Sequence, residues 1–184
     1  MKNKFLNSNE EYELITLRES HLQPLFSWNL EEKDFEKYTC RPLRIPQSFE
    51  EYTNKTLKAI SEENQKIYIL IKNKEYNNPL GKIALFDFNP RNHSAEFGYY
   101  IPSSNRGQGL GVIMLSLFIQ EIFTDDKLNL NKIYATTSSN NIPSIKILEK
   151  FSFTLDGRLR EHYWIKEEKY DQLNYSILKR EWKE

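Results

Sequence analysis

The sequence predicts a mixed α/β fold with a mostly antiparallel central sheet and helices on both faces. Three β-rich segments, residues 66–72, 80–88 and 95–101, follow one another with only short turn sequences between them, so they should pair antiparallel. A strongly amphipathic helix separates the third segment from a fourth, 132–137, and such a crossover joins parallel strands. Helical patterns both precede and follow this group, which places helices on both faces.

The N-terminal part is predicted to be helical after one short strand at residues 12–17. Residues 19–29 read as a helix because their apolar residues recur on one face. Periodicity is lost across residues 30–47, where two prolines favour a long loop or an irregular helical pair. Ser48-Phe-Glu-Glu51 is a capping box, so a further helix should begin there.

The C-terminal half is predicted to continue the sheet. Residues 109–123 carry apolar side chains at full helical periodicity and should precede the strand at 132–137. Residues 142–151 form a helix with Pro143 in its first turn, where proline is tolerated. Two final strands are expected at 153–160 and 172–179.

The amino-acid composition excludes several classes of protein. The 184 residues carry 26 Lys plus Arg and 26 Asp plus Glu, and a net charge of zero argues against a nucleic-acid polymer as partner. One cysteine, Cys40, excludes an intramolecular disulfide framework, and three scattered histidines form no metal-ligand pattern, so no metal is expected. We expect one cytoplasmic domain over residues 1–184, flexible over 1–10, with no membrane partner.

Glycine is concentrated at one place in the chain. Only six glycines occur, and three lie in Arg106-Gly-Gln-Gly-Leu-Gly111, between a predicted strand and a predicted helix. Glycine lets the backbone adopt positive φ, and amides at a helix N-terminus bind phosphate oxygens. The alternative is a helix entry that only needs flexibility. The spacing fits neither a dinucleotide fingerprint nor a Walker A loop.

Arg106-Gly-Gln-Gly-Leu-Gly111 after a strand resembles the pyrophosphate loop of the GNAT N-acetyltransferases. The segments 96–101 (EFGYYI) and 141–150 (NIPSIKILEK) resemble the RimJ/RimL subfamily, and the similarity covers roughly residues 12–182. Phe151-Ser-Phe153 departs from the subfamily, which usually has glycine before the last phenylalanine. The resemblance implies a GNAT fold with a parallel pair splayed around the coenzyme. It also implies transfer from acetyl-coenzyme A, as co-substrate, to a primary amine by direct attack.

By the same resemblance, the coenzyme should contact a path that runs from the third strand through the glycine loop to the next helix. The residues on that path are Tyr99, Tyr100, Ile101, Arg106, Gly107, Gln108, Gly109, Leu110, Gly111, Asn141 and Ser144. Ser144 is also the catalytic candidate that donates to the departing thiolate, or else it bonds to local backbone. Asn141 is a good N-cap, which is its alternative role.

Two glutamates are candidates for the general base. Strand alternation places Glu96, Gly98 and Tyr100 on one face, so Glu96 is the first candidate, with an ion-paired strand glutamate as the alternative. Glu161 is the second, because the direction of its side chain cannot be told from the sequence.

The resemblance also implies an acceptor pocket that is built by the N-terminal helices and the loop between them. Its expected residues are Trp28, Phe35, Tyr38, Tyr100 and Glu161. The acceptor is either a protein N-terminal α-amine or a small-molecule amine, and the second class includes detoxification of an antibiotic or an aminoacyl-nucleotide. A non-catalytic module that only binds acetyl-coenzyme A is a further alternative. The protein is expected to be a monomer or a homodimer.

Overall fold

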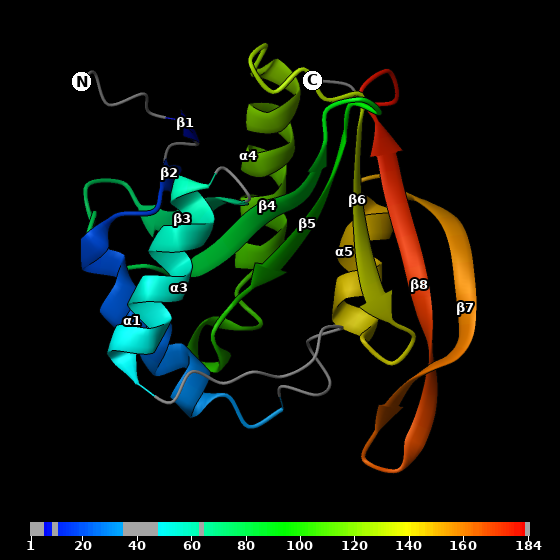
Figure 1. Cartoon of the computed structure of the whole chain (residues 1–184), viewed down its shortest axis with the longest axis horizontal. Coiled ribbons are helices and arrows are strands. Elements are labelled where there is room, and N and C mark those ends of the chain that lie inside the picture. The colour runs from blue at the N-terminus through cyan, green and yellow to red at the C-terminus, as the bar shows by residue number, and fades with distance from the viewer. Residues whose placement is uncertain (1–5, 9–10, 35–47, 63–64, 183–184) are drawn as a thin grey trace.

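The computed structural model describes residues 6–8, 11–34, 48–62 and 65–182, and Figure 1 shows their arrangement. The strands of the first half are β1 (Leu6–Ser8), β2 (Tyr12–Thr16), β3 (Gln65–Lys72), β4 (Gly81–Asn89) and β5 (Ser94–Tyr100). Those of the second half are β6 (Lys132–Ser138), β7 (Thr154–Ile165) and β8 (Glu168–Leu178). The helices are α1 (Glu19–Glu31), α3 (Phe49–Ser61), the 3-10 turn η1 (Ser103–Asn105), α4 (Leu110–Thr124) and α5 (Ile142–Lys150).

All described strands belong to one sheet with the order β1-β2-β3-β4-β5-β6-β8-β7. Every neighbouring pair is antiparallel except β5 and β6, which are joined by the crossover helix α4 and run parallel. The predicted mixed fold class is therefore confirmed. The parallel pair that the crossover predicts is present and lies near the centre of the sheet.

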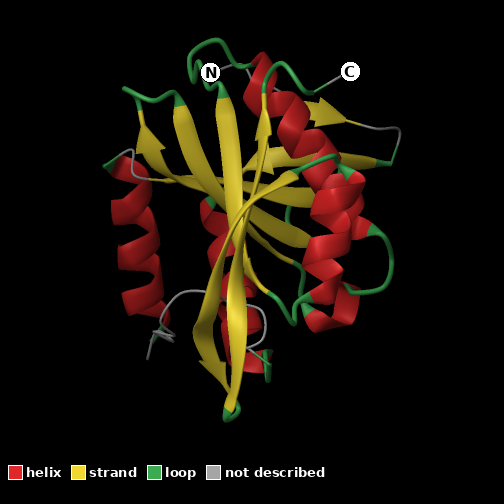
Figure 2. Cartoon of the chain, turned by 90° about the vertical axis from the view of Figure 1, so that its right-hand side faces the viewer, coloured by secondary structure: helices red, strands yellow, loops and turns green. Residues whose placement is uncertain are grey.

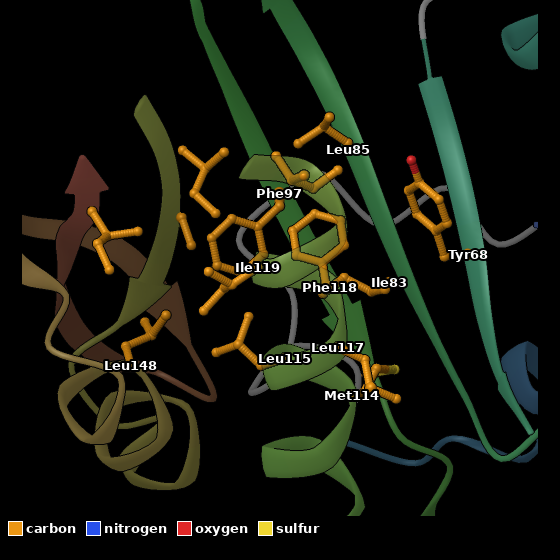
Figure 3. Close-up of a cluster of buried hydrophobic side chains, with 14 of the residues drawn as sticks. Tyr68, Ile83, Leu85, Phe97, Met114, Leu115, Leu117, Phe118, Ile119 and Leu148 are labelled. Atoms are coloured by element: carbon orange, nitrogen blue, oxygen red, sulfur yellow. The ribbon is translucent and has the colours of Figure 1, made fainter. Parts of the chain in front are cut away.

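Helices cover both faces of the sheet, and the two faces form separate cores. In Figures 1 and 2, α1 and α3 lie on one side and α4 and α5 on the other. The larger core packs α4 against inward residues of β2 to β6 and of β8, and Figure 3 shows Phe97, Phe118 and Ile119 near its centre. The smaller core joins Leu22, Leu25 and other apolar residues of α1 and α3 to isoleucines of β2 and β3. The predicted apolar faces of α1 and α4 are largely buried, whereas α3 buries Tyr52 and leaves Phe49 and Leu57 exposed.

The first helices begin much as their sequence signals indicate. The hydroxyl of Ser48 accepts a hydrogen bond from the backbone N–H of Glu51 at 3.1 Å, so the predicted cap of α3 is confirmed. Helix α1 continues to Glu31, two residues beyond the expected end, and residues 35–47 of the predicted loop lie outside the described part of the chain. Among the described residues, no helix has the length and apolarity that crossing a membrane requires.

The C-terminal hairpin is longer than predicted, and Figure 1 shows it extending past the rest of the sheet. Strands β7 and β8 meet at Lys166 and Glu167, whose φ values of 48° and 67° are those of a two-residue turn with left-handed central residues. Such turns normally carry Asn or Gly. Because neither occurs here, no turn signal marked the hairpin, and the strand ends predicted at residues 160 and 172 were wrong.

Candidate active site

The two parallel strands at the centre of the sheet separate after a short paired stretch. Strands β5 and β6 are in register only at Ser94–Lys132, Ala95–Ile133 and Glu96–Tyr134. Beyond Glu96, β5 pairs with β4 alone and β6 with β8 alone, and Figure 1 shows the two strands diverging. The edges facing this opening carry backbone amides with no neighbouring strand. An extended ligand with amide groups could pair there as a strand does.

The glycine loop lies at the end of β5 and leads into α4. Gly107 and Gly109 have φ of 78° and 79°, and an added Cβ would meet nothing within 4 Å at either residue. These two glycines are therefore required by backbone conformation, in a loop with room beside it. Gly109 is the N-cap of α4, so the first amides of a 15-residue helix point into the loop.

The third glycine of the cluster has a different role. Gly111 has ordinary helical backbone, and a Cβ there would lie 3.0 Å from Cδ1 of Ile147 in α5. Its missing side chain lets α4 and α5 approach closely. We predicted that all three glycines open the backbone to a ligand. For Gly111 this is corrected, because its lack of a side chain serves the packing of α4 against α5.

Arg106, which the sequence places at the start of the phosphate loop, has its guanidinium group on the other side of β5. Its Nε donates to the carbonyl of Ile101 at 3.0 Å, and its Nη2 forms an ion pair with Glu32 at the end of α1. The guanidinium also lies 5.6 Å from the ring centroid of Tyr100. In this arrangement the loop is tied to the N-terminal helix through the Arg106 side chain.

Glu32 is the centre of that connection, and no sequence signal distinguished it from its acidic neighbours. Its side chain is only 3% exposed, and it accepts hydrogen bonds from the hydroxyl of Tyr100 at 2.8 Å and the N–H of Asp34 at 3.0 Å. Burial acts to raise the pKa of Glu32, but the hydrogen bonds from Arg106, Asp34 and Tyr100 outweigh it and lower the pKa. Glu32 is therefore a buried carboxylate that stays ionised.

Two hydroxyl groups meet on the α5 side of the sheet. The hydroxyl of Tyr99 donates to Oγ of Ser144 at 3.1 Å, and the N–H of Ser144 is capped by Oδ1 of Asn141 at 3.4 Å. Burial raises the pKa of Tyr99, against the smaller effect of the hydrogen bond to Ser144. Tyr99 is thus a protonated donor to Ser144, which leaves the Ser144 hydrogen directed at another acceptor.

The opposite face of β5 carries the row Glu96, Gly98 and Tyr100. Glu96 is 8% exposed and accepts a hydrogen bond from Oγ1 of Thr136 across the parallel strands at 2.9 Å. Gly98 places no side chain between its two neighbours, and a Cβ there would meet only the ring of Phe86 at 3.5 Å and 3.6 Å. We call these three residues the acceptor row. Thr136 was not predicted.

The structure brings only some of the predicted acceptor residues to the acceptor row. The Trp28 ring lies 6.0 Å from that of Tyr100, so α1 does reach the acceptor row. Phe35 and Tyr38 lie outside the described residues. Glu161 is exposed in β7 and ion-paired with Lys169 at 2.8 Å. Three strand positions separate β7 from β5, which amounts to at least about 14 Å, and β5 and β6 diverge besides, so Glu161 does not join the row.

Comparison with known proteins agrees with this geometry. The sequence profile of the acetyltransferase (GNAT) domain matches residues 12–154. The uncharacterized N-acetyltransferase p20 of Bacillus licheniformis is 33% identical over 123 residues, which are 67% of this chain and 68% of that protein. The ribosomal-protein-serine acetyltransferase of Escherichia coli is 25% identical over 170 residues, covering 90% and 91%.

A solved structure extends the comparison to the whole fold. The spermidine N-acetyltransferase of Vibrio cholerae, in complex with CoA and spermine, superposes with a TM-score of 0.81. It is 23% identical and covers 94% of this chain and 98% of its own. At that identity the likeness establishes the fold.

Proposed function

Since the chain belongs to the acetyltransferase (GNAT) family, whose co-substrate is acetyl-coenzyme A, we propose that it acetylates a primary amine at the opening between β5 and β6. The observation that carries the proposal is the separation of these strands directly after Glu96. It leaves β5 amides beside a phosphate-binding helix end, with polar groups on both faces. Amides along the β5 edge would pair with the pantetheine arm and polarise the acetyl carbonyl.

The phosphates are assigned to the loop formed by Gly107, Gln108 and Gly109 and to the first amides of α4, at Leu110 and Gly111. The positive φ values of Gly107 and Gly109 turn this backbone without a side chain in the way. The helix N-terminus adds favourable partial charge. Arg106 joins this site through its backbone, because its guanidinium group is bound to Glu32.

The groups that act on the departing thiolate and those that act on the amine lie on opposite faces of β5. Ser144 donates to the departing sulfur, and Tyr99 supports it by donating to the Ser144 oxygen. The amine arrives from the acceptor row, where the missing side chain of Gly98 leaves room for it. Glu96 takes the proton of the amine, directly or through one water molecule. The nitrogen–carbon bond forms as the carbon–sulfur bond breaks, and the amine proton leaves through Glu96.

Two observations bear on the class of acceptor: the amines for which the relatives are named, and the aromatic side chains beside the acceptor row. The compared relatives are named for acetylating ribosomal protein and spermidine, so both peptide and small-molecule amines are candidates. An α-amine, with a pKa of about 8, loses its proton more easily than a lysine near 10.4. Trp28 and Tyr100 offer aromatic surface beside the row, which favours an acceptor with an apolar or planar group.

The test is release of coenzyme thiol from acetyl-coenzyme A, measured with N-terminal peptides, spermidine and amine antibiotics. Glu96→Gln should lower kcat by about 10²-fold or more. Glu161→Gln is the matched control, and it should retain full activity. Loss of activity in Glu161→Gln alone would transfer the base to Glu161. Coenzyme binding without thiol release for any amine would indicate a non-catalytic module.

A further inference from the structure

One cationic side chain on the face of the acceptor row has no partner among the residues that the structure describes. Lys82 of β4 makes no hydrogen bond or ion pair with any residue in the described part of the chain. In the sheet it lies between Ile69 of β3 and Tyr100 of β5. Burial lowers the pKa of Lys82, and no charge or hydrogen bond acts in the other direction. A half-buried ammonium group without a partner is costly, and it calls for a functional reason.

Lys82 shares its face with the acceptor row. Residues 82 and 84 alternate with Ile83 and Leu85, which are fully buried in the α4 core, so Lys82 lies on the α1 side. It is the register partner of Tyr100, and Ala84 is the partner of Gly98. Lys82 is thus the diagonal neighbour of Gly98, at about 7–8 Å between backbone positions, within reach of a lysine side chain.

Three carboxylates near the acceptor row are already engaged. Glu32 is bound by Arg106, Tyr100 and the N–H of Asp34. Glu96 accepts from Thr136, and the carboxylate of Asp34 is ion-paired with Lys166 at 3.1 Å. None of these three carboxylates pairs with Lys82, so within the described part of the chain its positive charge is left for another group.

We propose that Lys82 binds an anionic group of the acceptor, a carboxylate or a phosphate that lies a few bonds from the reacting amine. The inference rests on the proposed function, because Gly98 marks where the amine would stand. It narrows the acceptor to amines that carry an acid, such as amino acids or aminoacyl phosphate derivatives. It disfavours polyamines, whose second cation would face Lys82.

The experiment compares amines that differ in one anionic group. Phenylalanine against its amide tests the carboxylate, phosphoserine amide against serine amide tests the phosphate, and spermidine is the cationic reference. Wild-type protein should prefer the anionic member of at least one pair by about tenfold in kcat/KM. Lys82→Met should abolish that preference while keeping the neutral amine within a few-fold, and Lys82→Arg should retain it. Lys66→Met, which removes an exposed lysine of β3, is the matched control.

Equal rates within both pairs, or a preference that survives in Lys82→Met, would overturn the proposal. If the wild-type protein releases no thiol with any amine, the proposed function fails. The site is then tested by calorimetry with coenzyme A and N-acetylphenylalanine or its amide. Binding of the acid that is lost in Lys82→Met supports the anion site, and equal binding of acid and amide contradicts it. Circular dichroism checks that each variant is folded.

Discussion

Removing the buried carboxylate of Glu32 should destabilise the protein by about 2–3 kcal/mol. Glu32→Ala leaves the guanidinium group of Arg106 and the hydroxyl of Tyr100 without their acceptor. Breaking a fully buried pair costs about 3–5 kcal/mol. The Arg106 side chain is 31% exposed and can turn toward water, which places the cost below that range.

Urea unfolding measures the effect, and a surface pair provides the control. For a domain of this size the expected cost corresponds to a fall in Tm of roughly 5–10 °C. Asp34→Ala breaks the ion pair with Lys166, whose two side chains are 47% and 69% exposed, and it should cost under about 0.5 kcal/mol. If Glu32→Ala unfolds at the same urea concentration as Asp34→Ala, the connection between α1 and the glycine loop is not a stabilising one.

The same carboxylate sets a pH dependence. The folded pKa of Glu32 lies below the ordinary value of 4.5, since the three hydrogen bonds outweigh the opposing effect of burial. A lowered folded pKa means that the stabilisation is fully present above about pH 4.5 and is lost as the pH falls through the folded value. The stability difference between wild type and Glu32→Gln should therefore shrink on acidification below pH 4.5. A difference that is constant from pH 7 to pH 3 would contradict this reasoning.

Four further substitutions test the site and the end of α5. Gly109→Asp places a carboxylate in the phosphate loop and should abolish coenzyme binding in calorimetry while circular dichroism stays native; unchanged affinity would reject the loop assignment. Ser144→Ala should lower kcat by about 10²-fold at constant coenzyme KM, and Tyr99→Phe by less, and unaltered kcat in both would leave them structural. Ser152 has a φ of 60° after α5, so Ser152→Gly should stabilise by about 1 kcal/mol in urea unfolding, and a lower midpoint would argue against strain there.

Most helices and strands could be predicted because the spacing of apolar residues and the rules for chain connections determine them. The α4 sequence places its apolar residues at helical spacing, and the crossover from 95–101 to 132–137 required a parallel pair, which is present as β5 and β6. The short strand β1 was missed because three residues carry too little periodicity. The hairpin turn at Lys166 and Glu167 was missed because its left-handed residues are not the usual ones.

The sequence predicted most directly those parts of the candidate site that depend on backbone conformation. Gly107 and Gly109 were found because positive φ selects glycine. Glu32 and Lys82 could not be found, because their importance comes from burial and from residues far away in the chain, 74 positions in the case of Glu32 and Arg106. Arg106 shows the same limit: its motif predicted a phosphate ligand, while tertiary contacts direct its guanidinium group to Glu32.

The central claim is that acetyl transfer takes place at the opening between β5 and β6, with sulfur on one face and amine on the other. The most direct measurement is a structure of the protein with coenzyme A bound. The account predicts the pantetheine amides paired with the β5 edge beyond Glu96, the phosphates at Gly107 to Gly111, and the sulfur within hydrogen-bond distance of Ser144 Oγ. A coenzyme bound elsewhere, or a sulfur atom on the Glu96 and Tyr100 face, would contradict it.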